Sequence, residues 1–290
     1  MKHKSGFVNI IGRPNVGKST LMNALLGEKL SIITPKAQTT RHRIMGIANG
    51  DDYQVVFSDT PGVLQPNYKL QEQMLRYVYS TLEDADVFLV MTEPKDDFDD
   101  LSILQKVSKS GVPVMLLINK IDLASQNDVA VLHEKWEKDF PDWMVLPISA
   151  LKGVNLDQVF GRILELLPES PPYYPKDELA DKPVRFFVAE IVREKVLMNY
   201  QQEIPYSVEV MVESFKEDDR IAHIRIIIFV ARETQKGIII GHQGKALKKV
   251  GTEARKDLEG FLGKKVFLEL HVKVSKNWRD NDLQLRRFGY

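Results

Sequence analysis

The sequence predicts two folded domains: an α/β domain with a mostly parallel sheet covered by helices on both faces, then a smaller α+β domain. A length of 290 residues exceeds one average domain and suits two. Strand-length apolar runs alternate with helix-period segments as far as residue 167, which is typical of a parallel sheet with helical connections. A proline-rich stretch then interrupts the pattern. The expected parts are a first domain at 1–167, a linker at 168–183, a second domain at 184–280 and a basic tail at 281–290.

In the first domain, apolar runs predict strands and segments of 3.6-residue periodicity predict helices. The expected strands are 7–11, 44–48, 53–58, 87–92, 114–119 and 145–148. The expected helices are 19–26, 70–82, 101–110, 129–140 and 156–167. Because the strands are continuously apolar, both faces of their sheet should be buried. A ligand of such a sheet sits at the carboxyl ends of its strands.

The segment after residue 167 carries prolines at a density that neither a helix nor a central strand tolerates, so it predicts a stiff, extended linker. These prolines are Pro168, Pro171, Pro172, Pro175 and Pro183. Beyond them we expect strands at 184–189, 207–215, 221–230 and 266–274, helices at 191–200 and 245–260, and a strand-like apolar run at 238–240.

Charge is distributed unevenly along the chain. The totals of 40 basic and 40 acidic residues cancel, yet 181–290 holds 21 lysines and arginines against 16 acidic residues. Within 236–279 there are 11 lysines and arginines against 4 acidic residues. This surplus favours a polyanionic partner for the second domain. The chain has no cysteine, which suits a reducing compartment and excludes disulfides and thiolate metal sites. We find no signal peptide and no membrane span.

A glycine-rich loop follows the first predicted strand and precedes the first helix. Its sequence, 12–19, fits G-x-x-x-x-G-K-[ST], the phosphate-binding P-loop, in the expected context. Backbone N–H groups should surround nucleotide phosphates, Lys18 should reach the β and γ oxygens, and Ser19 should bind Mg²⁺. The expected nucleotide contacts here are Gly12, Asn15, Val16, Gly17, Lys18, Ser19 and Thr20.

Two later strand ends predict that the base is guanine. The sequence NKID places Asp122 where it can accept hydrogen bonds from guanine N1–H and its amino group, which adenine does not present in that arrangement. One strand later, SAL offers a backbone N–H to guanine O6. The expected base contacts are Asn119, Lys120, Asp122, Ser149, Ala150 and Leu151, so the ligand should be GTP or GDP.

The remaining nucleotide contacts come from 38–41 and from DTPG at 59–62. Asp59 should hold Mg²⁺ through water, and the Gly62 N–H should reach the γ-phosphate. A threonine hydroxyl should complete the Mg²⁺ shell while the γ-phosphate is present. We favour Thr40, with Thr39 as the open alternative. The expected metal set is therefore Ser19, Thr40 and Asp59, and the expected catalytic set is Lys18, Thr40, Gly62 and Asn15.

The residue after DTPG is Val63, where many GTPases have a glutamine that orients the attacking water. Intrinsic hydrolysis should therefore be slow. In some GTPases sharing G-x-P-N-x-G-K-S, the asparagine helps to bind K⁺ at the position of an arginine finger. We hypothesise the same for Asn15, against the alternative that this asparagine only stabilises the turn.

A second glycine loop, GHQG at 241–244, lies between two segments of the second domain. A G-x-x-G loop beside a three-stranded sheet resembles the KH module, in which the loop clamps single-stranded RNA and a neighbouring apolar groove takes the bases. The expected RNA contacts are Gly241, His242, Gln243, Gly244, Lys245, Lys248 and Lys249. Two choices stay open: Lys264 and Lys265 either extend this surface or are solvated. Trp278, Arg279, Arg286, Arg287 and Tyr290 either stack on bases or cap the core.

The chain resembles the Era family of bacterial ribosome-associated GTPases over essentially its whole length. The motifs that carry the resemblance, in order around a proline-rich linker, are GRPNVGKST, QTTRHR, DTPG, NKID, SAL and GHQG. The resemblance implies a P-loop GTPase domain plus a type II KH domain. It implies binding of the 3′ end of 16S ribosomal RNA, assembly of the 30S subunit, and a monomer in the cytoplasm with peripheral contact to the cell membrane. The alternatives are an RNA chaperone with a structural nucleotide, and a GTPase whose partner is a protein.

Overall fold

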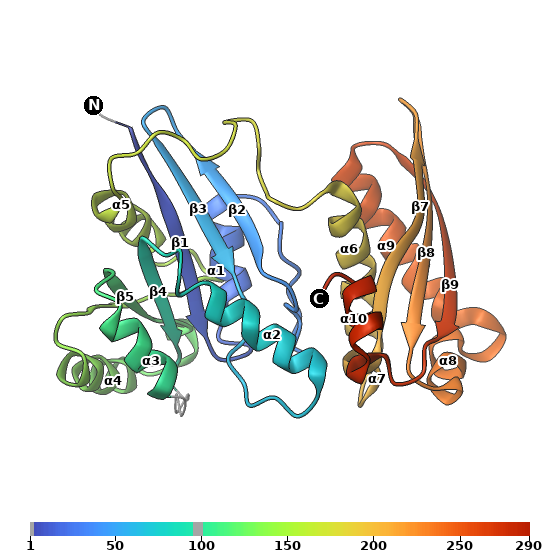
Figure 1. Ribbon diagram of the computed structural model, residues 1–290, viewed down its shortest axis with the longest axis horizontal. Helices are drawn as coiled ribbons and strands as arrows, with labels where there is room; N and C mark the ends of the chain where they lie inside the picture. The colour runs from blue at the N-terminus through green and yellow to red at the C-terminus, as the bar shows by residue number, and fades with distance from the viewer. Residues whose placement is uncertain (1–2, 95–100) are drawn as a thin grey trace. The chain divides into compact units, whose positions relative to one another are not determined.

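The structure, a computed structural model, describes residues 3–94 and 101–290, so residues 1–2 and 95–100 of the predicted first domain lie outside it. Its contacts divide the chain into two units (Figure 1). The first comprises Met1–Ile33, Thr40–Gln65 and Met74–Asp181, and the second comprises Thr34–Thr39, Pro66–Gln73 and Lys182–Tyr290. Among the residues described, none of the helices has the length and apolar character needed to cross a bilayer.

The first unit contains a six-stranded sheet in the order β2-β3-β1-β4-β5-β6. Its strands are β1 (Lys4–Gly12), β2 (Ile44–Asn49), β3 (Tyr53–Asp59), β4 (Val87–Thr92), β5 (Val114–Ile118) and β6 (Met144–Pro147). Among the strands that the structure describes in this sheet, only β2 pairs antiparallel with its neighbour, so the predicted mostly parallel sheet is confirmed. All six residues of β4 and all five of β5 are buried, as continuously apolar central strands require.

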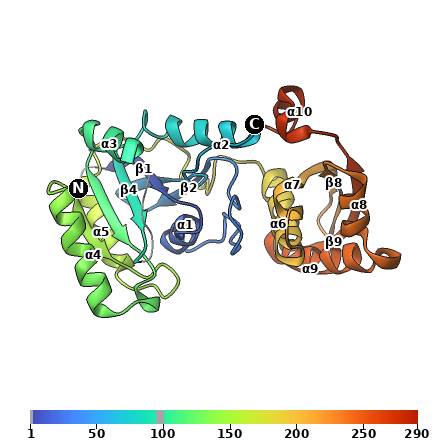
Figure 2. The same cartoon turned by 90° about the horizontal axis from the view of Figure 1, so that it is seen from below.

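Helices cover both faces of this sheet, as predicted. They are α1 (Lys18–Leu26), α2 (Lys69–Ser80), α3 (Leu101–Lys109), α4 (Gln126–Asp139) and α5 (Leu156–Leu166), with a short η1 (Ile121–Leu123). Figure 2 shows α2 and α3 on one face and α1 on the other. Val78 of α2, Ile103 of α3 and Trp136 of α4 share one buried cluster with the central strands. These helices therefore cover the sheet, and its loops at the carboxyl edge are left to bind a ligand.

The proline-rich segment is bonded to the sheet of the first unit. The Gln54 side chain on β3 accepts from the N–H groups of Tyr173 and Tyr174, at 2.7 and 2.9 Å, and donates to the Tyr174 carbonyl at 2.8 Å. Asp181 accepts from the Met45 N–H at 2.9 Å. Isolated antiparallel bridges also join Glu169 to Lys4 and Ala180 to Gly46, so the segment is extended and its backbone is bonded to the sheet.

The second unit packs helices on one face of a three-stranded sheet in the order β7-β8-β9, with β8 and β9 parallel. Its elements are α6 (Val184–Asn199), α7 (Ile204–Ser207), β7 (Glu209–Glu217), β8 (Ile221–Val230), α8 (Glu233–Ile240), η2 (His242–Gly244), α9 (Lys245–Leu262) and β9 (Lys265–Val274). Alternate β8 residues, from Ala222 to Val230, meet α6, α8 and α9 in one buried cluster. The predicted α+β class is confirmed.

Two predicted elements in this unit were wrong. Residues 184–189, expected as a strand, form the first turns of one helix that runs to Asn199. Val188, Val192 and Val196 recur every four residues and are fully buried, so helical packing overrides the strand preference of these β-branched residues. The strand-like run 238–240 ends helix α8, where Ile239 is buried and Ile238 is 49 % exposed.

The C-terminal tail forms η3 (Trp278–Asp280) and α10 (Asp282–Arg287). Trp278 is fully buried, donates from Nε1 to the Ser207 carbonyl at 3.0 Å and packs edge-on against Phe288. Tyr290 donates its hydroxyl proton to Glu209 at 2.8 Å. Of the two roles left open for the tail, capping the core therefore holds for Trp278, whose ring has no face free to stack on a base.

Candidate functional site

The first glycine loop lies at the carboxyl end of β1 and leads directly into α1. Gly17 has φ of +105°, and a Cβ there would lie 2.3 Å from Asn119 Nδ2. Only glycine fits such a left-handed, crowded position. Asn15 also has positive φ, at 64°, and is exposed. The loop is thus shaped by its glycine and asparagine to present backbone N–H groups at a helix start, the arrangement that binds phosphate.

Lys18 is 5 % exposed and its ammonium lies over this loop. Its Nζ donates to the carbonyls of Gly12 at 3.0 Å and Arg13 at 2.8 Å. These bonds fix a cation beside the backbone N–H groups that phosphates would meet. The predicted position of Lys18 for β and γ oxygens is consistent with this geometry.

Three side chains of the expected metal set converge beside the loop. Ser19 Oγ lies 2.6 Å from Asp59 Oδ2 and 2.9 Å from Thr40 Oγ1, and Thr40 Oγ1 lies 3.3 Å from the same carboxylate. Thr39 Oγ1 instead bonds Thr34 and the Lys36 carbonyl, both at 2.6 Å. The structure therefore brings Thr40, and not Thr39, to Ser19 and Asp59.

Asp59 is a buried carboxylate with incomplete pairing. Burial raises the pKa of Asp59, while the Ser19 hydrogen bond and the Lys18 charge oppose the rise. Among described residues Oδ1 finds no hydrogen-bond partner, and no cluster of three His, Cys, Asp or Glu residues forms a metal site. One buried carboxylate with two hydroxyls fits Mg²⁺, a cation that prefers oxygen ligands and takes the rest from water and phosphates. The residues present therefore fit the expected ion.

The guanine side of the site is braced by Asn119. Its Nδ2 donates to the Val16 carbonyl at 2.8 Å, and its Oδ1 accepts from the Ala150 N–H at 2.9 Å. Asn119 thus links the phosphate loop to the SAL loop, a role that the sequence alone did not indicate. The Ala150 N–H, one of the expected base contacts, already donates within the protein.

Asp122 is oriented by a neighbouring hydroxyl. Ser149 Oγ donates to Asp122 Oδ1 at 2.6 Å, which fixes the carboxylate plane. Lys120 has φ of 63° and pairs with Glu93 at 2.5 Å, while Leu151 is 76 % exposed. The structure therefore gathers NKID and SAL at one edge of the sheet, with one carboxylate oriented to accept hydrogen bonds.

The DTPG loop is fastened to the phosphate loop. The Val63 N–H donates to the Gly12 carbonyl at 3.1 Å, and a Cβ on Gly62 would lie 2.4 Å from the Pro14 nitrogen. Val63 itself is 5 % exposed and belongs to the buried cluster under α2 and α3. The side chain at the position of the expected water-orienting residue is thus part of the core, a consequence of packing that no motif shows.

The second glycine loop joins α8 to α9. Gly241, Gln243 and Gly244 all have positive φ, at 69°, 52° and 73°, and a Cβ on Gly241 would lie 2.6 Å from Ala246 Cβ. His242 and Gln243 are exposed. The chain here turns through left-handed conformations into the start of an 18-residue helix, so its backbone is open to an approaching phosphate chain.

A groove of about 410 Å³ runs beside this loop between α9 and β9. It is lined by Gly244, Leu247, Lys248, Gly251, Thr252, Arg255, Val266, Phe267, Leu268 and Leu270. Lys248 was predicted, whereas Thr252, Arg255 and the half-exposed Phe267 were missed. Their spacing of three to four residues along one helical face was a signal that could have found the first two.

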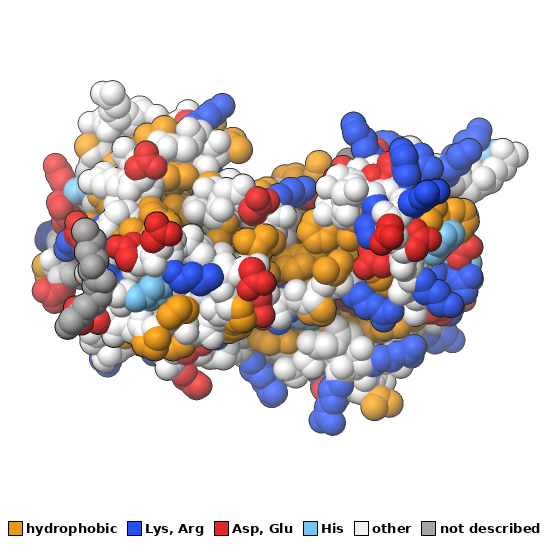
Figure 3. Space-filling view, turned by 90° about the horizontal axis from the view of Figure 1, so that it is seen from above, with side chains coloured by type: hydrophobic (Ala, Val, Ile, Leu, Met, Phe, Trp, Pro, Cys, Tyr) orange, Lys and Arg blue, Asp and Glu red, His pale blue; other side chains and the backbone are white. Residues whose placement is uncertain are grey.

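The other lysines of the second unit have different surroundings. Lys245 and Lys249 are exposed, and Lys249 Nζ lies 3.8 Å from Glu253 on the same helix. Lys264 pairs with Glu217 at 3.0 Å and donates to the Asp218 carbonyl, so its ammonium is already bonded. Figure 3 shows lysine and arginine side chains gathered over the second unit on the face drawn, in keeping with its basic surplus.

Family models match two parts of the chain. Residues 7–120 match the model described as 50S ribosome-binding GTPase, and residues 203–279 match the model described as KH domain. The first match contains the phosphate loop and DTPG. The second contains the glycine loop and its groove.

Curated relatives and solved structures match over nearly full length. GTPase Era of Caldanaerobacter subterraneus subsp. tengcongensis is 47 % identical over 296 residues, covering 100 % of this chain and 99 % of that protein. GTPase Era of Geotalea daltonii is 47 % identical over 289 residues, covering 99 % of this chain and 97 % of that protein. A point variant of Aquifex aeolicus Era bound to GDP and AlF₄⁻ is 43 % identical with a TM-score of 0.95, covering 99 % of each chain. A structure of Era in complex with MgGDPNP and nucleotides 1506–1542 of 16S ribosomal RNA is 42 % identical with a TM-score of 0.95, covering 99 % of each chain.

Proposed function

This chain belongs to the GTPase Era family, and we propose from that premise that it is a GTP-hydrolysing switch that binds the 3′ end of 16S ribosomal RNA and acts in assembly of the 30S subunit. The observation that carries the proposal is one chain with two glycine loops, each at the start of a helix and each with different surroundings. The first, beside Asp122, suits one guanine nucleotide. The second, beside an open groove, suits a strand of several nucleotides.

GTP lies with its phosphates along the backbone of 12–19 and its base edge on Asp122. The carboxylate accepts from guanine N1–H and the amino group, and ATP would offer it neither of these two donors. In hydrolysis, water oxygen attacks the γ-phosphorus while the bond to the β,γ-bridging oxygen breaks, releasing GDP and phosphate. Lys18 offsets the negative charge on the β and γ oxygens, and the Gly62 N–H orients the γ-phosphate.

Mg²⁺, when bound, would supply further positive charge beside the phosphates. Ser19 and Thr40 offer their hydroxyl oxygens, and Asp59 offers a carboxylate that Ser19 already orients. Thr40 belongs to the loop that precedes β2, so its participation couples the order of that loop to the γ-phosphate. The proposed test is a nucleotide titration in which GTP binding depends on Mg²⁺ and ATP does not compete.

The attacking water is oriented without the side chain of residue 63, because Val63 is buried. Slow intrinsic turnover follows. Asn15, exposed beside the loop, is the proposed ligand for a K⁺ ion that takes the place of an arginine finger. Turnover should then be faster in K⁺ than in Na⁺, and Asn15→Ala should remove the difference. Equal turnover in both salts would limit Asn15 to stabilising the turn.

RNA phosphates lie along 241–244 beside Lys245 and Lys248, and unstacked bases enter the adjoining groove. The test is binding of a labelled RNA with the 3′-end sequence at increasing salt. Gly241→Asp places a bulky negative group where even an added Cβ would lie 2.6 Å from Ala246 Cβ. It should abolish RNA binding and leave basal GTPase activity unchanged. Loss of both activities would show that the two sites are not separable.

We also propose that the protein acts as a monomer in the cytoplasm with peripheral contact to the cell membrane. The absence of cysteine, which suits a reducing compartment, supports the location. The membrane contact and the monomeric state follow only from the resemblance. Sedimentation of the purified protein with and without vesicles tests both.

A further inference from the structure

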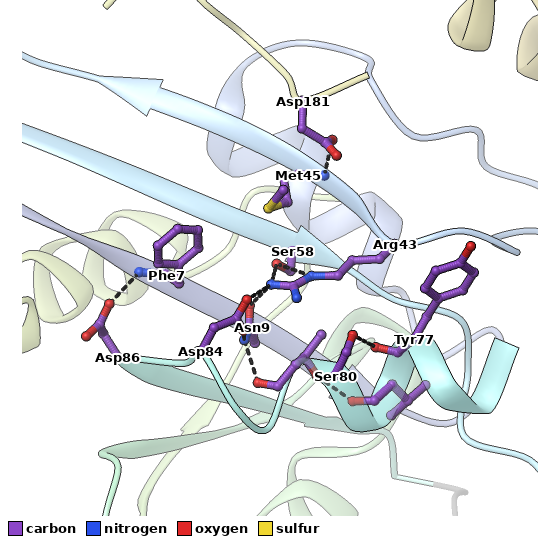
Figure 4. Close-up of polar contacts among 12 residues, drawn as sticks. Phe7, Asn9, Arg43, Met45, Ser58, Tyr77, Ser80, Asp84, Asp86 and Asp181 are labelled. Atoms are coloured by element: carbon purple, nitrogen blue, oxygen red, sulfur yellow. Dashed lines mark hydrogen bonds and ion pairs between the residues drawn. The ribbon is translucent and has the colours of Figure 1, made fainter. Parts of the chain in front are cut away.

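A polar network lies on the sheet of the first unit (Figure 4). Arg43 donates from Nε and Nη2 to Ser58 Oγ, at 3.1 and 2.9 Å, and its Nη2 lies 2.7 Å from Asp84 Oδ2. Asn9 donates from Nδ2 to Asp84 Oδ1 at 2.8 Å and to the Thr81 carbonyl at 2.6 Å. One guanidinium thus connects strand β3, strand β1 through Asn9 and Asp84, and the loop after α2.

These residues replace apolar side chains where a buried sheet face would ordinarily have them. Asn9 and Ser58 are fully buried and directly opposite each other across β1 and β3. Buried amides and hydroxyls cost free energy unless they are bonded, and Arg43 and Asp84 together satisfy both. Such a network fixes one arrangement of its members more strictly than apolar packing does, because each donor has a required direction.

The members of the network are close in sequence to the proposed metal-binding side chains. Ser58 directly precedes Asp59, and Arg43 lies three residues after Thr40. Three residues span at most about 10 Å, so a fixed Arg43 limits where Thr40 can move. The backbone ladder adds little at this point, since Ile44 and Asp59 form the last pair of β2 and β3, and ladder ends fray.

We propose that Arg43 is a positioning residue for the Mg²⁺ site, one that holds the loop carrying Thr40 against the strand carrying Asp59. This rests on the proposed function, because it assumes that Thr40 binds the ion of a Mg²⁺·GTP complex. The Arg43 guanidinium does not touch the metal-binding oxygens. It determines how readily Thr40 Oγ1 stays near Ser19 and Asp59, where the structure places it.

The test measures Mg²⁺ binding without requiring hydrolysis. Full-length protein is loaded with a fluorescent non-hydrolysable GTP analogue, and Mg²⁺ is titrated. Arg43→Ala should raise the half-saturating Mg²⁺ concentration about tenfold, a factor appropriate to the loss of charge-assisted hydrogen bonds. Ser58→Ala should raise it less, because Asp84 still holds the guanidinium. The control is Arg162→Ala, which removes an exposed ion pair with Glu165 on α5 and should change nothing.

A combined variant separates positioning from general destabilisation. In a Thr40→Ala background, Arg43→Ala should leave the Mg²⁺ requirement unchanged and still lower the melting temperature as it does in the wild type. Hydrogen exchange of the 36–43 segment in the analogue-bound protein should also rise in Arg43→Ala. The proposal would be overturned if Arg43→Ala raised the half-saturating Mg²⁺ concentration equally in the wild-type and Thr40→Ala backgrounds. It would also be overturned if Arg43→Ala raised that concentration in neither background. Failure of the wild type to bind GTP would instead refute the proposed function.

Discussion

Helix α9 contains two glycines in different surroundings, and replacement by alanine should weaken RNA binding at one of them and leave it unchanged at the other. Gly251 lines the groove, and an added Cβ would lie 3.3 Å from Leu270 Cδ1. Gly260, in the last helical turns, is exposed, and no atom lies within 4 Å of its added Cβ. Glycine inside a helix costs about 1 kcal/mol relative to alanine, so a glycine retained in mid-helix needs another reason.

At Gly260 the alanine should stabilise the protein by somewhat less than about 1 kcal/mol, because the position is near the helix end. At Gly251 the same gain is partly offset, since the Leu270 methyl group must move by a few tenths of an ångström. We expect a net stabilisation of about 0.5 kcal/mol. The new methyl group, however, takes space from the groove. An excess methyl in a fitted pocket costs about 1–3 kcal/mol, so RNA affinity should fall about tenfold or more.

The assay pairs thermal unfolding with a titration of the 3′-end RNA at fixed salt, for both variants and the wild type. We predict that Gly251→Ala is at least as stable as the wild type yet binds RNA more weakly. Gly260→Ala should be more stable and bind RNA equally. Unchanged RNA affinity in Gly251→Ala would show that no base contacts this part of the groove, and the assignment of the groove to bases would then be wrong.

Three further predictions concern single side chains. Asp122→Asn replaces one carboxylate acceptor with an amide donor, so the nucleotide preference should move from guanosine to xanthosine. Competition binding measures this preference, and an unchanged preference for guanosine would contradict the role of Asp122. Burial raises the pKa of Asp59 above its unfolded value, so the ionised carboxylate destabilises the metal-free fold above that raised pKa. Asp59→Asn should therefore raise the melting temperature of the metal-free protein at neutral pH and weaken Mg²⁺ binding. In the wild type, Mg²⁺ affinity should fall as the pH drops through the raised pKa of Asp59. A Mg²⁺ affinity that does not change with pH would contradict the role of this carboxylate. Trp278→Ala should cost about 3–5 kcal/mol of folding free energy in urea unfolding, whereas a base-stacking role predicts little loss of stability and a selective loss of RNA affinity.

Much of the first unit could be predicted because its strands are apolar throughout and its motifs follow them. Phosphate and guanine chemistry restrict the residue types at Lys18, Ser19, Asp59 and Asp122, so the sequence alone predicts them as site residues. The choice of Thr40 over Thr39 needed coordinates, since either hydroxyl suits the chemistry. The brace formed by Asn119 also depends on contacts between loops that are distant in sequence.

The second unit was harder to predict because local preference and tertiary packing disagree there. The β-branched and aromatic residues from Val184 favour a strand locally, yet their four-residue spacing buries one helical face. The groove residues Arg255 and Phe267 come from a helix and a strand whose contact no local pattern shows. Arg43 was absent from the predicted site for the same reason, since its partners Ser58 and Asp84 lie far along the chain.

We propose that the nucleotide bound in the first unit alters the affinity of the second unit for RNA. The most direct measurement is the dissociation constant of the 3′-end RNA for protein loaded with a GTP analogue, with GDP or with no nucleotide, together with nucleotide affinities with and without that RNA. Linkage requires that any factor by which the analogue changes RNA affinity equals the factor by which RNA changes analogue affinity. We predict tighter RNA binding in the analogue-bound protein and an equal reciprocal factor. Identical RNA affinities in all three states would contradict the claim and leave two independent binding sites.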